Sequence, residues 1–135
     1  MYFEELIDYP VRGLVIRPTD EDADFGEIYT SMSYVAGTIT NILLEKDIAH
    51  NLIFSDKGRT IYIIPRQHES VQNQKNLKCG FFEIGGLAIC RNKEFYDNIT
   101  AQTFEEALKK EVSLSDQEFE SLKKEIIGLF EKNFQ

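Results

Sequence analysis

The stretch from Ala49 to Arg66, AHNLIFSDKGRTIYIIPR, decides the fold, because it predicts two strands joined by a tight turn. Apolar runs cover residues 52–54 and 61–64, and the second run is rich in β-branched side chains. Gly58 lies between them and can take the positive φ that such a turn needs. Pro65 has no amide hydrogen, so we expect the second strand to end there.

A hairpin alone is only marginally stable, so the flanking segments must complete the sheet and cover it. Residues 1–10 can form either an extended arm or a single helical turn, and residues 11–17 predict a strand. In residues 21–46 apolar side chains recur at steps of three and four, which predicts a long helix capped by Thr19 or Asp20. Gly37 inside this helix suggests close packing on the sheet.

The second half of the chain predicts one more strand and then helices. Residues 69–78 are polar and predict a loop, whereas residues 80–91 predict the third strand of a meander, with a bulge at Gly85–Gly86. Helices are expected at 94–98, 103–112 and 114–134. Ser115 and Glu118 have the spacing of a capping box. The predicted fold is therefore α+β, with an antiparallel sheet covered by a long helix and by C-terminal helices, and residues 1–135 form a single domain.

Composition limits the function classes. The net charge of −8 argues against binding nucleic acid, although a local basic pocket for a phosphorylated ligand is compatible with it. No apolar stretch approaches the length of a membrane span, and the first residues lack a signal-peptide pattern. Cys79 and Cys90 would lie on opposite faces of the strand predicted for 80–91, and neither has zinc-site spacing. We therefore expect reduced thiols in a cytoplasmic protein, with no metal and no cofactor.

The chemically competent side chains favour binding over catalysis. The sequence contains no glycine-rich phosphate loop, serine elbow or carboxylate pair. His50 is expected to have an edge or capping role, and His68 has no partner spaced to orient it. Arg59 and Arg66 are stronger candidates for ligand contacts, because a guanidinium matches the geometry of a phosphate. They are an odd number of residues apart on one strand, so they point to opposite faces, about 23 Å from one another.

Several segments resemble the C-terminal half of the GDP-hexose phosphorylase family, and more weakly galactose-1-phosphate uridylyltransferases. They are Tyr9–Val15 (YPVRGLV), Asn51–Asp56 (NLIFSD) with Gly58, Ile61–Pro65, Glu83–Ile84 with Gly86, and Glu111–Ser115 (EVSLS). The resemblance implies a histidine triad-like fold built on an antiparallel sheet. In that family the nucleophilic histidine lies in a His-x-His motif just before the first of these segments. This chain contains no His-x-His, so the resemblance does not imply a catalytic histidine here.

Two interpretations of function follow from the resemblance. In the first, the chain is the C-terminal lobe of a nucleotide-sugar phosphorylase or nucleotidyltransferase and is inactive alone. Asn51, Arg59, Arg66, Gln67 and His68 would then bind the phosphates or the sugar, and Arg66 is the preferred phosphate contact. In the second, the chain is a complete, non-catalytic nucleotide-binding or protein-interaction module. Either a homodimer or a catalytic partner lobe is expected to cover exposed apolar surface, with residues 2–3 and the sheet edge as contacts.

Overall fold

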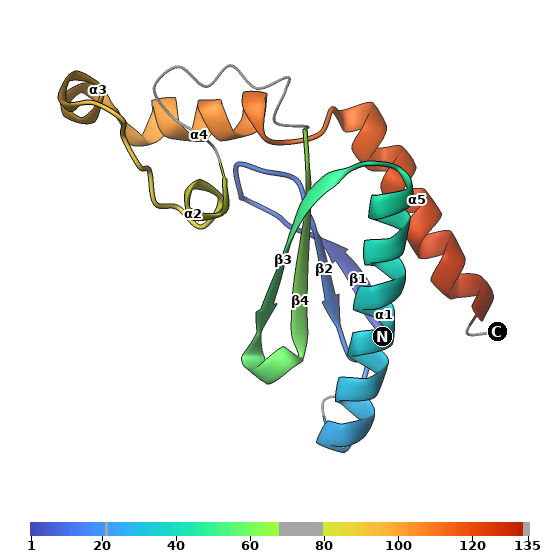
Figure 1. The fold of residues 1–135 in the computed structure, drawn as a ribbon. Helices are drawn as coiled ribbons and strands as arrows, with labels where there is room; N and C mark the ends of the chain where they lie inside the picture. The colour runs from blue at the N-terminus through green and yellow to red at the C-terminus, as the bar shows by residue number, and fades with distance from the viewer. Residues whose placement is uncertain (21, 68–79, 134–135) are drawn as a thin grey trace.

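The computed structural model describes residues 1–20, 22–67 and 80–133, and it confirms an α+β fold with an antiparallel sheet (Figure 1). The strands lie in the order β1–β2–β4–β3. Their bounds are β1 Tyr2–Glu5, β2 Leu14–Arg17, β3 Ala49–Ser55 and β4 Thr60–Arg66. The helices are α1 Phe25–Glu45, α2 Phe81–Ile84, α3 Lys93–Asn98, α4 Ala101–Glu111 and α5 Asp116–Asn133, and a 3-10 turn, η1, covers Asp56–Gly58.

The hairpin predicted from the sequence is confirmed as β3 and β4. The two strands pair from Ala49 opposite Arg66 to Ser55 opposite Thr60. Gly58 has a φ of 86°, as the turn requires. The second strand continues one residue past Pro65, so the expected end was wrong by one position. The reason is that β2 pairs with β4 only as far as Ile63, so no strand on that side needs the missing amide.

The predicted third strand over residues 80–91 is wrong. Its start forms the short helix α2, which ends in a glycine cap rather than a bulge. Gly86 has a φ of 95°, its N–H donates to the carbonyl of Glu83 at 3.0 Å, and the N–H of Leu87 donates to that of Phe82 at 2.9 Å. These two bonds define a Schellman motif. Cys90 is a free thiol, whereas Cys79 and the predicted loop at 69–78 lie outside the described residues.

The missing strand comes from the N-terminus instead. Tyr2–Glu5 pairs with β2 as an antiparallel edge strand, so the extended arm is confirmed over the helical turn. β2 itself begins only at Leu14, later than the predicted strand over 11–17. Just before it, a Cβ atom on Gly13 would lie 2.9 Å from the carbonyl oxygen of Ile63. The close approach of these two backbones therefore requires glycine at this position.

The long helix forms as predicted but begins later. Asp24 caps α1, because its side chain accepts a hydrogen bond from the N–H of Gly26 at 2.9 Å, so the predicted caps Thr19 and Asp20 were wrong. Glu21 lies outside the described residues. Gly37 was expected to pack on the sheet, and this was also wrong. It lies on the exposed side of α1, and a Cβ atom there would meet nothing within 4 Å.

Two apolar clusters hold the fold together, one on each side of the sheet. On the first side, Leu14, Ile16, Ile61 and Ile63 pack with buried residues of α1 and α5. On the second side, a smaller cluster joins the sheet to α2 and α4, with the members Val11, Ile64, Ile84, Leu108 and Val112. Figure 1 shows this second group of helices gathered near the end of the sheet where β4 leaves it.

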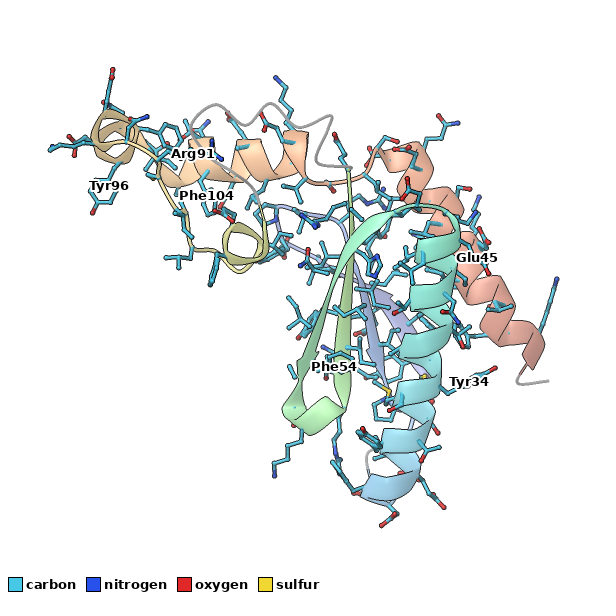
Figure 2. The ribbon with its side chains drawn as sticks, in the orientation of Figure 1. Tyr34, Glu45, Phe54, Arg91, Tyr96 and Phe104 are labelled. Carbon is cyan, nitrogen blue, oxygen red and sulfur yellow. The ribbon has the colours of Figure 1, made fainter. Side chains whose placement is uncertain are left out.

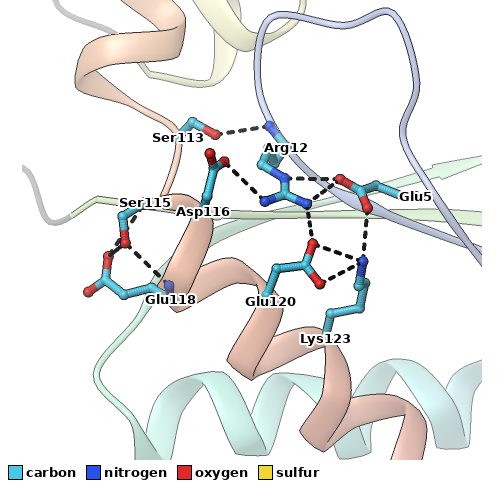
Figure 3. Close-up of polar contacts among 8 residues, drawn as sticks. All are labelled: Glu5, Arg12, Ser113, Ser115, Asp116, Glu118, Glu120 and Lys123. Carbon is cyan, nitrogen blue, oxygen red and sulfur yellow. Dashed lines mark hydrogen bonds and ion pairs between the residues drawn. The ribbon is translucent and has the colours of Figure 1, made fainter.

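A network of charged side chains fastens α5 to the start of the sheet (Figure 3). The Arg12 Nη2 atom lies 2.6 Å from carboxylate oxygens of both Glu5 and Glu120, and Nη1 lies 3.1 Å from Asp116. Lys123 lies 3.0 Å from both Glu5 and Glu120. The residues of this network are half-buried except Glu120 and Asp116, which are exposed at 42% and 92% of their side-chain surface. The predicted capping box at the start of α5 is also confirmed.

This network predicts a loss of stability in acid. Burial works against the charged form of Glu5, but hydrogen bonds from Arg12 and Lys123 outweigh it, so the pKa of Glu5 lies below its ordinary value of 4.5. Hydrogen bonds from the same two residues lower the pKa of Glu120. A lowered pKa in the folded state contributes stability above about pH 4.5, and that stability is lost as the pH falls through the folded pKa.

We therefore expect Glu120→Gln to be less stable than wild type at neutral pH and the difference to shrink below about pH 4.5. Urea denaturation followed by circular dichroism at neutral and acidic pH measures this difference. Glu45→Gln is the matched control, because Glu45 is exposed at the end of α1, outside the network (Figure 2). A Glu120→Gln deficit that is the same at both pH values would contradict the assignment.

Candidate functional site

The candidate site lies at the end of the sheet where β3 begins and β4 ends. Asn51 is opposite Ile64, and Ala49 is opposite Arg66. Side chains alternate between faces along a strand, so Asn51 and Arg66 share one face, that of the buried Ile64. This is the second side of the sheet, away from α1, because Ile64 belongs to the smaller cluster. The register therefore brings an amide and a guanidinium to neighbouring positions on adjacent strands.

These two side chains carry buried polar atoms that lack a partner. Among the described residues, no hydrogen-bond partner is found for the buried Oδ1 of Asn51 or for the buried Nε and Nη1 of Arg66. Arginine keeps its charge in proteins, so burial cannot be relieved by loss of a proton. A buried donor or acceptor without a partner costs about 1–3 kcal/mol, and more when it is charged. The arrangement is therefore suited to a ligand that offers acceptors to Arg66 and a donor to Asn51.

A pocket of about 290 Å³ opens beside Arg66 at the C-terminal end of α1, with Asp47 and His50 in its lining. The Nδ1 atom of His50 lies 2.8 Å from the carbonyl oxygen of Ile48. A carbonyl can only accept, so Nδ1 carries the proton and Nε2 is the acceptor of the neutral ring. His50 thus lies on the edge strand β3 and bonds to the backbone just before that strand.

Gln67 has a different environment from the one expected of a ligand contact. Its Nε2 atom donates to the carbonyl oxygens of Lys110 at 3.1 Å and Ser113 at 2.8 Å. Its backbone N–H donates to the carbonyl of Val112 at 2.8 Å. Gln67 thus holds the exit of β4 against the link between α4 and α5. His68, the next predicted site residue, lies outside the described residues.

Arg59 lies at the opposite end of β4 from Arg66. It lines a smaller pocket of about 190 Å³ together with Arg17, Asp56 and Thr60. Arg59 directly precedes β4 and Arg66 ends it, so the strand Thr60–Arg66 separates them by about 20 Å. The structure does not bring them together, so one small ligand cannot contact both.

The segments that carry the family resemblance converge near Arg66. The hydroxyl of Tyr9 donates to the carbonyl of Ile84, and the N–H of Arg12 donates to Oγ of Ser113 at 3.0 Å. Ser113 in turn forms an isolated β-bridge with Arg66. The positioning roles of Arg12 and Ser113 were not predicted from the sequence. Their signal was present, because both lie within the resembling segments Tyr9–Val15 and Glu111–Ser115.

Two features are absent from the part of the chain that the structure describes. There, no three or more His, Cys, Asp or Glu side chains gather in a way that could hold a metal ion. Within the same residues, every helix is too short or too polar to cross a membrane.

Comparison with known proteins assigns a family to this arrangement. The family described as GDPGP1-like, C-terminal domain matches residues 1–133. GDP-L-galactose phosphorylase 2 of Arabidopsis thaliana is 24% identical in an alignment of 124 residues that covers 85% of this chain and 27% of that protein. The chain thus spans about a quarter of the length of this relative, and no solved structure matches significantly. Because the match covers nearly all of its residues, the chain belongs to the GDPGP1-like C-terminal domain family.

Proposed function

We propose that this domain forms part of the nucleotide-sugar site of a phosphorylase or nucleotidyltransferase, with the nucleophile supplied from elsewhere. Its family membership and the name of its plant relative support this role. A histidine triad-like ancestry belongs to the same proposal. The observation that carries it is the pair of half-buried residues Asn51 and Arg66, whose buried polar atoms lack partners among the described residues.

The chemistry of this pair favours a ligand with two kinds of group. Arg66 offers charged N–H donors, which bind phosphate oxygens more strongly than they bind neutral acceptors. The Asn51 Oδ1 atom accepts only, so it is matched by a hydroxyl or N–H group rather than by a phosphate oxygen. A nucleotide sugar carries its phosphates next to hydroxyl groups and so satisfies both residues.

Replacing Arg66 with Ala is expected to weaken binding of a GDP-sugar about ten- to a hundred-fold, because a hydrogen bond to a charged group contributes about 1.5–3 kcal/mol. Isothermal titration calorimetry of wild type and variants with GDP and a GDP-hexose measures the change. Arg59→Ala is the matched control, since it removes a guanidinium from the residue just before the other end of β4.

The outcomes separate the interpretations. If only Arg59→Ala weakens binding, the ligand lies at the turn end of the hairpin and the site is misplaced. If wild type binds neither nucleotide, the alternative of a non-catalytic interaction module is favoured. Asn51→Ala should weaken the GDP-hexose more than GDP if the sugar hydroxyl is its donor, whereas an equal loss would place the donor on the nucleoside.

A further inference from the structure

The strand β1 lies at one edge of the sheet, so one side of its backbone pairs with no other strand. The N–H of Leu6 donates to the carbonyl of Gly13 at 2.8 Å, which fixes the phase of the ladder between β1 and β2. Hydrogen-bonded pairs occur at every second residue of an antiparallel ladder, so Phe3 and Glu5 turn their N–H and C=O groups to the open edge. Among the described residues, nothing bonds to these groups. They are the groups with which an added strand would pair.

A pocket of about 420 Å³ lies beside this edge, where β1 meets α5. Lys123 of α5 lies 3.0 Å from Glu5 at the end of β1 (Figure 3). The ring of Phe130 stacks on that of Phe3, with the ring centres 5.3 Å apart. The helix therefore runs antiparallel to the strand, and the pocket lies near the start of the strand. Its lining consists of four apolar side chains and one carboxylate, namely Met1, Phe3, Ile127, Phe130 and Glu131.

Strand geometry connects the open backbone groups to the pocket. A residue added opposite Phe3 would exchange hydrogen bonds with its N–H and C=O groups. Residues that are directly opposite on neighbouring strands place their side chains on the same face of the sheet. The side chain of Phe3 lines the pocket, so the added residue would present its own side chain there. Because the lining is mostly apolar, this residue should be apolar as well.

A carboxylate at the rim of the pocket adds a second requirement. Glu131 is exposed and forms no ion pair with any other described residue. In an antiparallel addition, the residue two positions after the apolar one lies opposite Met1, which lines the pocket together with Glu131. A Lys or Arg at that position would therefore complement the charge of Glu131.

A second copy of β1 does not match this groove. With Phe3 opposite Phe3, the Glu5 carboxylate of one copy would approach Glu131 of the other, and each Phe3 ring is already stacked on its own Phe130. With Glu5 opposite Phe3 instead, a carboxylate would enter an apolar pocket, which is costly. Both registers are therefore unfavourable for self-association.

We infer that the open edge of β1 and the adjoining pocket form a docking site for an extended segment of a partner protein, which adds a strand antiparallel to β1. An apolar side chain of that segment fills the pocket beside Phe3, and a Lys or Arg two residues later faces Glu131. In this mode of recognition, main-chain hydrogen bonds supply affinity, and the side-chain pocket supplies specificity. The inference does not depend on the proposed function.

The test uses an acetylated and amidated peptide, Thr-Thr-Thr-Leu-Thr-Lys-Thr, titrated into the isotope-labelled chain and followed by NMR. The signal of the Phe3 N–H should shift, because this group gains a hydrogen bond, and its titration gives the dissociation constant. N-methylation of the Leu removes the N–H that would bond to Phe3 and should weaken binding about tenfold or more. N-methylation of the following Thr is the matched control. Its N–H points away from β1, so binding should change by less than about twofold.

Two protein variants test the charge requirement. Glu131→Lys should weaken binding of the peptide about fivefold, and a peptide with Glu in place of Lys should restore it. Glu105→Lys is the matched control, because it makes the same change of charge at an exposed position of α4, and its effect should stay within about twofold. Circular dichroism verifies that both variants are folded.

Three outcomes would overturn the inference. The first is a Phe3 signal that does not move at millimolar peptide. The second is a peptide with N-methylated Leu that binds as well as the unmodified one, since the edge would then form no main-chain hydrogen bonds. The third is an equal loss in Glu131→Lys and Glu105→Lys, which would reflect net charge alone.

Discussion

Replacing Phe119 with Ala is expected to lower the free energy of unfolding by about 3–5 kcal/mol, the usual cost of deleting a buried aromatic ring. Phe119 is completely buried in α5, and it belongs to the apolar cluster that joins α1, α5 and the sheet. Its ring also lies under Arg12, whose Cζ atom is 4.2 Å from the ring centre. Truncation would therefore leave a cavity and remove a cation–π contact at once.

Urea denaturation monitored by circular dichroism measures the change. Phe54→Ala is the control, because Phe54 is 56% exposed on the edge strand, and its loss should cost less than about 1 kcal/mol. Equal effects of the two substitutions would mean that α5 does not dock on the sheet as described. Small domains are stable by only about 5–15 kcal/mol, so Phe119→Ala should leave the protein near its unfolding threshold.

Arg12→Ala is expected to have the second-largest effect, a loss of about 2–3 kcal/mol at neutral pH. The guanidinium is in contact with three carboxylates, and its removal leaves Glu5 and Glu120 facing each other with only Lys123 between them. Removing one partner from a fully buried ion pair costs about 3–5 kcal/mol, and the partial exposure of this network reduces that figure. Arg12→Lys should recover only part of the loss, because an ammonium cannot contact three carboxylates in a planar fork.

Lys93→Ala is the matched control for Arg12→Ala. Lys93 forms a 2.5 Å ion pair with Asp97 within α3, but its side chain is 87% exposed. An exposed pair of this kind contributes about 0.5 kcal/mol or less. Thermal or urea denaturation in low and high salt distinguishes the two sites. An Arg12→Ala variant no less stable than Lys93→Ala would show that the network contributes no more to the free energy of unfolding than an exposed ion pair does.

The sequence predicted those elements whose stabilising contacts are local. Three features depend only on residues a few positions apart, and all three are confirmed. They are the helical period of α1, the turn at Gly58 and the capping box at Ser115 and Glu118. The sequence allows β1 to be either an extended arm or a helical turn, because Glu4 and Glu5 have low strand propensity. Their stabilisation comes from Arg12 and Arg17, which become neighbours only in the folded sheet.

The error at residues 80–91 has a local cause as well. An apolar run followed by two glycines fits both a bulged strand and a short helix with a glycine cap. The structure resolves the ambiguity through Glu83, whose carboxylate accepts the N–H of Gly80 at 2.9 Å and so begins a helix. The sequence contained this spacing of three residues, but a helix of one turn gives too little periodicity to be recognised.

For the candidate site, the sequence predicted the relative placement of some residues better than it predicted what each one contacts. The separation of seven residues was enough to place Arg59 and Arg66 near opposite ends of β4. The neighbourhood of Asn51 and Arg66 depends on the register of the hairpin, which the turn fixes. The side chain of Gln67 could not be placed in advance, because its partners lie more than forty residues away, at Lys110 and Ser113.

The position of α5 in the larger cluster has a consequence for synthesis on the ribosome. Leu14 and Ile16 emerge about a hundred residues before Phe119, Ile126 and Phe130 of α5, which partly bury them. Until residues 116–133 have left the exit tunnel, one side of the sheet lacks part of its cover. The nascent chain must therefore carry exposed apolar surface while the residues between β2 and α5 are synthesised, the period in which a holding chaperone would protect it from aggregation.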